Sequence, residues 1–552
     1  MFHALPRRTG RDLRSRTRGV TLLALLLAGP LTTPADAWDF RWITQFGDAG
    51  TEVSAGVLIK GNAVYVAGYR RPPGASSSDG YLRKYNRTGS LVWADQFGTT
   101  ASEVVNGVVA LDDMIVVAGG TNGTFPGQTP AGSRDVFLRA YKSTGEVLWT
   151  KQFGTPAFDG LGINGLATDG RAIYVAGETF GTFPGEPINP AVDTFVAKID
   201  AQGDLLWLHQ LGIRSFTRLG LVGVSADEHG VVVVGSFLEG PEETDAGGGF
   251  IRRLSTNGEL EWQQDLVRRD LCQTTFWGVS IHDHVAYVVG QWLDLTFPDP
   301  DAACTNPSDS PVVGVVRAYN VKNGTLKWQR RIKGRTVPGG ENFTGAKVIS
   351  ASDAGVFVGA NLTESFAGHW QPTPPQRPEC PGLNPGFPDI FPDSLDAYVR
   401  RYSLDGDVVW THQFGGPVFD LVTAISADSK AVAAVGDTSC GIDSNHAFGG
   451  GARDVFVVRI GAEPTTIVGF IQLLIGRLET RLDAGRLQER DFNALVQLLE
   501  DALKALETGS PSSARHTLLR VADQVDALTD AGQLLNGSQV LRGFARELAE
   551  KP

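Results

Sequence analysis

Between residues 42 and 461 the chain is a succession of short apolar runs separated by polar turns that contain glycine. One kind of run is apolar throughout and rich in β-branched residues, and it recurs as VYVAG, IVVAG, IYVAG, VVVVG, AYVVG, VFVGA and AAVG. Such a run predicts a strand that is covered on both faces. A second kind, such as DVFLRAY at 135–141, gains basic residues toward its end, which predicts a strand nearer the solvent. The pattern therefore predicts many short strands.

The predicted strands recur in a fixed order of four. After Trp93 the order is VVNGVVAL, MIVVAG, VFLRAY and EVLWTKQFG, with a tight turn ending in Gly145 before the last strand. Each unit ends on a tryptophan strand, and the tryptophans are Trp42, Trp93, Trp149, Trp207, Trp262, Trp328 and Trp410. A four-stranded unit cannot bury both of its faces alone, so the units are expected to stack around an axis. The sequence therefore predicts an all-β, seven-bladed β-propeller of four-stranded antiparallel blades.

The two ends of the repeat region complement each other. The unit after Trp410 has three predicted strands and stops near Gly461 without a tryptophan strand, whereas WITQFG at 42–47 stands alone before the first full set. We expect the N-terminal strand to complete the last blade and close the ring, because closure leaves no long unpaired sheet edge.

A small residue follows each tryptophan within the first strand of the next unit. It is an alanine, Ala424, in the last unit, and in the others it is Gly56, Gly107, Gly165, Gly223, Gly278 and Gly345. Glycine inside a strand commonly marks close approach of backbones. We therefore expect these positions where the inner strands converge on the axis. An aspartate opens many third strands, and its repetition indicates a structural role, such as accepting hydrogen bonds from turn amides: Asp79, Asp135, Asp193, Asp396 and Asp454.

The two ends of the chain differ in character from the repeats. Residues 1–37 combine six arginines, a short apolar stretch and Ala35-Asp36-Ala37, which predicts a signal peptide. Residues 38–462 form the predicted propeller. In residues 463–552 apolar positions recur at helical spacing, as at Phe492, Leu495 and Leu499, and Ser510-Pro511 marks a helix start. This segment predicts a small all-α helical bundle.

Charge and export limit the classes of partner. The chain has a formal net charge of −12 and no apolar stretch that predicts a transmembrane segment after the signal peptide. An acidic exported protein is a poor nucleic-acid binder, so we expect no nucleic-acid partner. The predicted location is periplasmic, cell-surface or secreted. The oligomeric state is not specified by the sequence.

The longest insertions fall between second and third strands, where they share one face with the connections between blades. That face, here called the loop face, carries all four cysteines, Cys272, Cys304, Cys380 and Cys440. Export favours disulfides, and of the three connectivities we favour Cys272–Cys304 with Cys380–Cys440. One acidic loop on this face offers oxygen ligands for calcium, but it lacks the glycine and terminal glutamate of an EF-hand, and we favour a solvated acidic loop: Asp294, Asp299, Asp301 and Asp309. No cofactor motif is present.

Long loops on one face of a repeat protein often mark its binding face. The sequence therefore favours a non-enzymatic binding or scaffolding module for protein or glycan partners on the loop face. The alternative is a propeller enzyme, a lyase or hydrolase, with carboxylates around the channel mouth. A third possibility is a spacer that presents the helical bundle.

The repeat resembles a known family. Asp135 to Tyr141, Gly145, Trp149 and Gln152-Phe153-Gly154 closely resemble the SBBP repeat of exported bacterial seven-bladed propellers, and the resemblance spans roughly residues 42 to 460. It implies the fold and export, and no catalytic residues. AYKSTGEVLW at 140–149 is also similar to the tryptophan-docking motif of quinone-dependent dehydrogenases, although Lys142 replaces the usual aspartate. The C-terminal segment from NALVQLLEDAL onward resembles the FIMAH domain.

Overall fold

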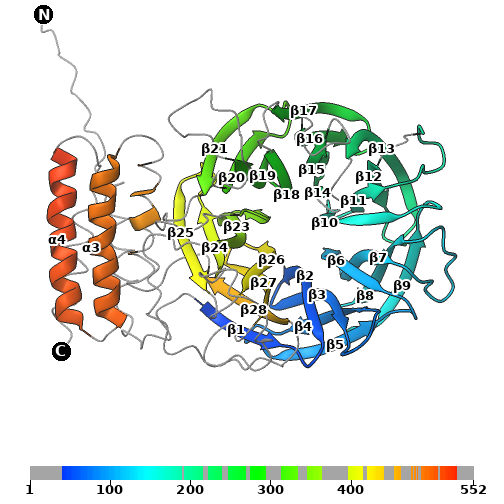
Figure 1. The fold of residues 1–552 in the computed structure, drawn as a ribbon, viewed down its shortest axis with the longest axis horizontal. Helices are drawn as coiled ribbons and strands as arrows, with labels where there is room; N and C mark the ends of the chain where they lie inside the picture. The colour runs from blue at the N-terminus through cyan, green and yellow to red at the C-terminus, as the bar shows by residue number, and fades with distance from the viewer. Residues whose placement is uncertain are drawn as a thin grey trace, which may run out of the picture.

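A computed structural model describes residues 40–188, 192–215, 222–238, 247–268, 274–293, 312–332, 345–362, 396–414, 419–439, 453–461, 487–507 and 510–530, together with 471, 474–476, 478, 479 and 482. Most of the described chain is strand. The strands form four-stranded antiparallel sheets that radiate from a central axis, so the chain folds as a β-propeller (Figure 1).

The sheets follow the sequence order from the axis outward. The first two sheets are β2 (Thr51–Lys60), β3 (Ala63–Arg71), β4 (Asp79–Tyr85) and β5 (Leu91–Phe97), then β6 (Glu103–Leu111), β7 (Met114–Thr121), β8 (Asp135–Lys142) and β9 (Val147–Phe153). An eight-stranded sheet joins two such sets through one parallel bridge between β10 and β14: β10 (Asp159–Thr168), β11 (Ile173–Thr179), β12 (Val192–Ile199), β13 (Leu205–Ser215), β14 (Val222–Asp227), β15 (Gly230–Leu238), β16 (Gly247–Ser255) and β17 (Leu260–Arg268).

The remaining sheets complete the ring. They are β18 (Thr274–His282), β19 (Val285–Leu293), β20 (Val312–Asn320) and β21 (Leu326–Ile332), then β22 (Val348–Ser352), β23 (Gly355–Leu362), β24 (Asp396–Tyr402) and β25 (Val408–Phe414). The last sheet combines β26 (Asp420–Ala427), β27 (Ala431–Thr438) and β28 (Asp454–Gly461) with β1 (Phe40–Phe46).

The core lies between neighbouring sheets, and the apolar second strands form much of it. In β3, for example, Val64 and Val66 are fully buried against Val435 and Val457 of the last sheet. A strand that packs on both faces must be apolar along its whole length, which explains the runs such as VYVAG. Each fully buried valine of this kind stabilises the fold by about 1.5–3 kcal/mol.

The first strand of the chain pairs with the last, as the sequence predicts. β1 runs antiparallel to β28, with Trp42 opposite Arg459 and Phe46 opposite Val455. The start of β2 is joined to the same sheet, because the Glu52 amide donates to the Arg453 carbonyl at 3.1 Å. β1 is therefore the fourth strand of the last sheet, beside β26, β27 and β28.

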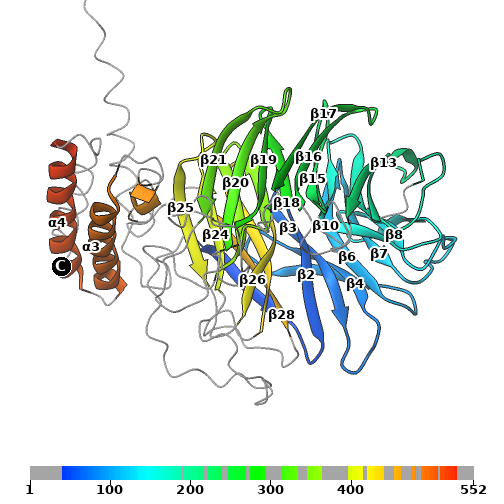
Figure 2. The ribbon, with the colours of Figure 1, turned by 45° about the horizontal axis from the view of Figure 1, so that its top comes forward.

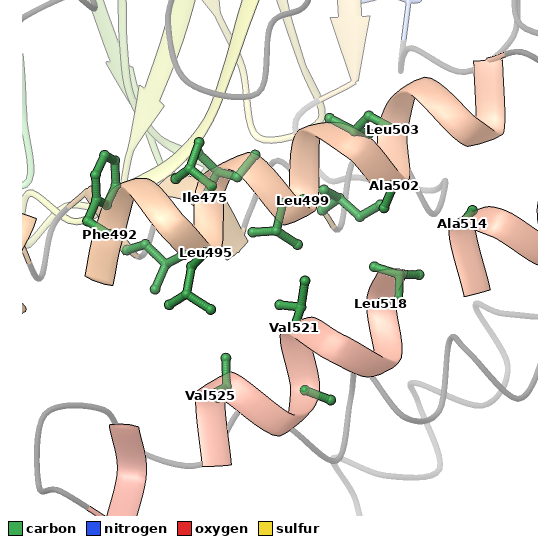
Figure 3. Packing of buried hydrophobic residues seen from close by; sticks show 14 of the residues in the cluster. Ile475, Phe492, Leu495, Leu499, Ala502, Leu503, Ala514, Leu518, Val521 and Val525 are labelled. Atoms are coloured by element: carbon green, nitrogen blue, oxygen red, sulfur yellow. The ribbon is translucent and has the colours of Figure 1, made fainter. Parts of the chain in front are cut away.

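Two helices follow the ring and pack against each other. They are α3 (Glu489–Glu507) and α4 (Pro511–Asp530), and Pro511 occupies the first helical position that the sequence predicts for it. Leu495 and Leu499 of α3 face Leu518 and Val521 of α4 in one buried cluster (Figure 3). These residues recur every three or four positions, which places them on one face of each helix.

A helical segment that precedes α3 packs on the outer strand β25, and the helices lie beside this strand in both views (Figures 1 and 2). A Cβ on Gly476 would lie only 2.8 Å from Cγ1 of Val408, so this segment and β25 are in close contact. A buried ion pair of 3.1 Å joins Arg400 of β24 to Glu479. Val408, which this segment contacts, is only 3% exposed.

Candidate functional site at the axis of the ring

The repeated carboxylates have a structural role in the sheets. In five sheets the aspartate that opens the third strand accepts a hydrogen bond from the fourth-strand glutamine, in the pairs Gln45–Asp454, Gln96–Asp79, Gln152–Asp135, Gln210–Asp193 and Gln413–Asp396. Asp135 also accepts from the amides of Ala131 and Gly132 at 2.8 and 3.0 Å, as the sequence predicts for this position. These carboxylates therefore serve the fold.

The repeat tryptophans join each sheet to the next. Five of the indole groups donate to a carbonyl in or beside the turn before the neighbouring sheet's outer strand, in the pairs Trp93–Ser143, Trp149–Ala201, Trp207–Thr256, Trp262–Val321 and Trp328–Leu404. The ring lies over the turn glycine, which leaves no room for a side chain: a Cβ on Gly203 would lie 3.0 Å from the Trp149 ring. Trp410 packs against Phe357, with their ring centres 5.8 Å apart.

The inner strands meet at the axis. A Cβ on Gly56 would lie 2.8 Å from the Val108 nitrogen of the next sheet, and one on Gly223 would lie 2.9 Å from the Trp277 carbonyl oxygen. Asn164 reaches across from β10, and its amide donates to the carbonyls of Trp277 and Lys347 at 2.7 and 3.2 Å. The backbones of β10, β18 and the residues before β22 are therefore fixed to one another.

Five polar residues from four sheets lie at the loop-face ends of their strands and are linked in a chain by the effects of their charges, and we call them the axial cluster. They are Tyr69 at the end of β3, Arg134 before β8, Lys347 before β22, Asp437 at the end of β27 and Arg453 before β28. Burial raises the pKa of the Tyr69 phenol and the charge of Asp437 raises it further, whereas the charges of Arg453, Arg71 and Arg134 lower it. The ends of second strands and the starts of first and third strands all lie at the loop face, which is why these residues stand at the same end of their sheets.

Asp437 is the carboxyl at the centre of this cluster. It is 1% exposed. Its Oδ1 accepts hydrogen bonds from the Ser54 amide at 2.9 Å and the Ser54 hydroxyl at 2.7 Å. Its Oδ2 lies 3.6 Å from Nη1 of Arg453. Burial raises the pKa of Asp437 to about 6, and the bonds from Ser54 and Arg453 hold it from rising further. This carboxyl therefore changes protonation state near neutral pH.

The cations of the cluster lie against aromatic rings. The Lys347 ammonium is 5.5 Å from the centre of the Trp277 ring, and the Arg134 guanidinium is 5.3 Å from that of Phe158. Burial lowers the pKa of Lys347, Arg453 lowers it further, and Asp437 opposes both. Lys347 and Arg453 therefore repel each other, and only one carboxylate of the cluster offsets them.

Glu52 also has a raised pKa, of about 7, chiefly because of burial. Its position at the start of an inner strand is repeated by Glu103 and Asp159, which accept from the amides of Thr99 and Thr155 in the loop before the strand. Glu52 accepts from the Asp48 amide in the same way, at 3.4 Å. We therefore assign Glu52 a structural role.

The sequence did not single out Asp437. Its position follows the last glycine of the second strand, where the repeats carry unlike residues such as Tyr69, Gly120 and Glu178. The available signal was a charged residue, Asp437, at a position that varies among the repeats, in a unit whose third strand is preceded by a basic residue, Arg453.

The other predicted chemistry lies elsewhere in the chain. The calcium candidates Asp294, Asp299, Asp301 and Asp309 and the four cysteines fall outside the described residues. Within the described residues no group of three or more His, Cys, Asp or Glu side chains has the arrangement of a metal site. No helix in that part of the chain is long and apolar enough to cross a membrane.

Comparison with known proteins finds matches among solved structures alone. No family model matches the chain, and no curated protein matches it. Among solved structures it is similar to the acylaminoacyl peptidase of Pyrococcus horikoshii at 10% identity and a TM-score of 0.38, covering 75% of this chain and 53% of that one. The chain thus spans about half the length of that peptidase.

Two further similarities are to propellers of other proteins. The β-propeller domain of the Trilobed protease from Pyrococcus furiosus matches at 9% identity and a TM-score of 0.37, over 76% of this chain and 98% of that one. The quinohemoprotein alcohol dehydrogenase of Comamonas testosteroni matches at 14% identity and a TM-score of 0.35, over 77% of each chain. The chain is a β-propeller protein.

These comparisons correct one expectation from the sequence. A non-enzymatic binding or scaffolding module was the favoured function, and the similarity to an acylaminoacyl peptidase and to a protease propeller overturns it. The sequence argument failed because it rested on where the long loops lie, and loop length says nothing about the chemistry of the residues beneath them.

Proposed function

We propose that this protein is a hydrolase whose active site is the axial cluster, with Asp437 as the general acid–base. The observation that carries the proposal is the setting of Asp437: a buried carboxyl, bonded to a hydroxyl, flanked by Arg453 and Lys347, with a pKa of about 6. A carboxyl poised near the working pH is suited to take a proton from water and return it to a leaving group.

The neighbouring groups complete the chemistry of a hydrolytic site. Arg453 and Lys347 carry the positive charge that stabilises an oxyanion as water attacks a polarised carbonyl or phosphoryl group. Ser54 acts as a positioning residue, because its amide and hydroxyl both hold the same oxygen, Oδ1, of Asp437. In this proposal Asp437 accepts the proton of the attacking water and later donates it to the departing group.

We further propose the finer identity of the chain. Counting the eight-stranded sheet as two blades gives seven blades of four strands, in support of an SBBP-type propeller, and α3 and α4 support a FIMAH-like C-terminal domain. The sequence of residues 1–37 supports export to the periplasm, cell surface or medium. The acid–base chemistry proposed for Asp437 requires no cofactor.

The test is turnover by the purified full chain in isotopically labelled water, with pooled peptide, ester, glycoside and phosphoester substrates. Hydrolysis places the label in a product, and Asp437→Asn should lower the rate at least about 100-fold. Asp135→Asn is the matched control, because Asp135 is also 1% exposed and holds only its own sheet. Unlabelled products with a new double bond would instead show a lyase, and turnover that survives Asp437→Asn in a folded variant would refute the assignment.

A further inference from the structure

Arg134 and Arg453 occupy the same position in two different sheets. Each comes directly before the aspartate that opens a third strand. The Arg134 carbonyl accepts a hydrogen bond from the Asp159 amide at 2.9 Å. The Arg453 carbonyl accepts one from the Glu52 amide at 3.1 Å, and both donors begin the inner strand of the following sheet. The backbones around the two arginines are therefore equivalent, and their side chains can be compared.

Only one of the two arginines has a carboxylate partner. In the last sheet Oδ2 of Asp437, on the second strand, lies 3.6 Å from Nη1 of Arg453. The same strand register places Gly120 at the corresponding position in the sheet of Arg134. Glycine has no side chain, so the sheet of Arg134 keeps the cation and lacks the carboxylate.

The Arg134 guanidinium lies in the space that a side chain at Gly120 would fill. A Cβ there would be 2.7 Å from Nη2 and 2.9 Å from Cζ. Nε of Arg134 is buried, and it has no hydrogen-bond partner among the described residues. Burial lowers the pKa of Arg134, and the charge of the Tyr69 phenol opposes this. A buried guanidinium donor without a partner has lost its hydration, and a carboxylate compensates for that loss.

An aromatic pair adjoins the guanidinium. Phe158 comes directly before β10, and Phe180 comes directly after β11. The Arg134 guanidinium is 5.3 Å from the centre of the Phe158 ring, and the Phe158 and Phe180 rings meet edge to face at 5.8 Å. Phe180 is 49% exposed. The surface beside the unpaired cation therefore offers an apolar contact.

We propose that Arg134, Phe158 and Phe180 form a binding site for a carboxylate that is attached to an apolar group. The ligand's carboxylate replaces, at Arg134, the side chain that Asp437 supplies in the last sheet, and its apolar group packs on Phe180. A free aryl acid and the C-terminal end of a peptide share this chemistry. The inference goes beyond the proposed function, because binding at Arg134 requires no turnover at Asp437.

The Phe158 ring alone is the competing explanation for the position of Arg134, since an aromatic face attracts a guanidinium without any ligand. Arg453 also lies over a ring, 5.5 Å from the centre of Phe419, and it has Asp437 as a partner as well. A ring contact and a carboxylate partner are therefore compatible. The two explanations differ in one measurement, because only a binding site gives saturable binding that depends on the charge of Arg134.

The experiment is isothermal titration of the full chain with hydrocinnamate, with its neutral amide and with N-acetylglycylphenylalanine, at low and at high sodium chloride. We expect saturable binding of at least one of the two acids, weakened by salt, and no saturable binding of the amide. Arg134→Met should weaken the binding about tenfold or more, which is the effect of one charge-assisted hydrogen bond. The acid that binds more tightly distinguishes a free aryl acid from a peptide end.

Gly120→Asp and Gly120→Asn form a matched pair of variants. The three atoms nearest to a Cβ at Gly120 all belong to the Arg134 guanidinium, so a new side chain displaces that group alone. Aspartate supplies the missing internal partner, whereas asparagine has the same shape and no charge. Gly120→Asp should therefore bind the acid about tenfold or more weakly than Gly120→Asn does. Lys84→Met should leave binding unchanged, because its ammonium lies over the Tyr65 ring, outside the site.

The outcomes separate this inference from the proposed function. Equal binding of the acid and its amide, unchanged binding in Arg134→Met, or equal binding by the two Gly120 variants would overturn the inference. Saturable binding without turnover in labelled water would keep it and overturn the hydrolase proposal, and turnover without saturable binding of either acid would do the reverse. Asp437→Asn should abolish turnover and retain acid binding. Thermal melting shows which variants are folded, and substitutions at two independent positions protect the test from the loss of one.

Discussion

Asp437 and Glu52 show why a raised pKa is an incomplete guide at the scale of single residues. Burial raises both, to about 6 and about 7. Glu52 occupies a position that Glu103 and Asp159 repeat with the same kind of loop contact, so its environment is a property of the repeat. Asp437 occupies a position where the repeats differ, and its partner Ser54 comes from the neighbouring sheet. Departure from the repeat, together with the cations around it, is what makes Asp437 the functional candidate.

The stability of the protein should depend on pH through Asp437. Its pKa is about 6 in the folded state against an ordinary 3.8, so the folded state binds the proton more tightly than the unfolded chain does. The stabilisation that this proton provides is complete below about pH 4 and is lost as the pH rises through about 6. The difference between the two pKa values corresponds to about 3 kcal/mol of unfolding free energy.

The measurement is denaturant unfolding of wild type and Asp437→Asn at several pH values from about 4 to 7. Asparagine does not titrate, and the other carboxyls titrate alike in both proteins. The free energy of unfolding of wild type minus that of the variant should therefore fall by about 3 kcal/mol across this range. A difference that stays constant with pH would show that Asp437 is ionised throughout.

The sequence could predict residues whose role is repeated, and could not predict the site. The third-strand aspartates recur, so their structural role was readable before their glutamine partners were seen. Lys347 and Asp437 each occur once at their repeat positions, Arg134 shares its repeat position with Arg453, and Arg134, Lys347 and Asp437 lie far apart in the chain. Only the closed ring places β27 beside β2 and brings the charges of Asp437 and Lys347 within reach of each other.

At the scale of elements, equivalent positions on the outer strands differ in their exposure to solvent. The apolar residues just before the tryptophan are exposed on most outer strands, with Leu91 at 48% and Leu205 at 51%. On β25 the corresponding Val408 is 3% exposed, because the helical segment around Gly476 covers it. The sequence predicted helices from apolar spacing alone. It could not predict where they dock, since VVW on β25 reads like LVW on β5.

The indole hydrogen bond between sheets should have a measurable effect on stability. Nε1 of Trp149 donates to the Ala201 carbonyl at 3.0 Å, whereas Nε1 of Trp42 is buried without a partner among the described residues. Both rings lie over a turn glycine of the next sheet, Gly203 and Gly89. Phenylalanine at either position removes part of the ring, but only at Trp149 does it remove a hydrogen bond.

We therefore expect Trp149→Phe to lower the free energy of unfolding by about 1 kcal/mol more than Trp42→Phe does, as loss of one buried hydrogen bond implies. Urea unfolding of the two variants and wild type checks this. Equal losses would show that the packing of the ring, and not its donor, joins the sheets.

At the scale of the whole molecule, the propeller was the part of the structure that the sequence predicted best. Four strand types in fixed order specify four-stranded sheets, and the count of tryptophan strands specifies that the first strand belongs with the last sheet. The parallel bridge between β10 and β14 was not predictable, because it is made by Asn164 within a register shift of β10. The Asn164 amide also donates to the Lys347 carbonyl at 3.2 Å, so the irregular stretch of β10 that the sequence did not predict contacts a residue of the axial cluster.

Closure by β1 gives the final prediction. Deleting Phe40–Phe46 removes the strand opposite β28 and exposes that strand's hydrogen-bonding edge, together with the surfaces that Trp42, Ile43 and Phe46 cover. Three half-buried apolar side chains of this size stabilise the fold by about 4 kcal/mol. We expect a loss of at least this size in denaturant unfolding, with a tendency to aggregate.

Deleting Pro73–Ser76 from the mostly exposed β3–β4 loop is the control and should change stability by less than about 1 kcal/mol. A peptide of residues 40–48 added in trans should restore stability to the first variant, and equal stability of the two deletions would mean that β1 does not hold the ring closed.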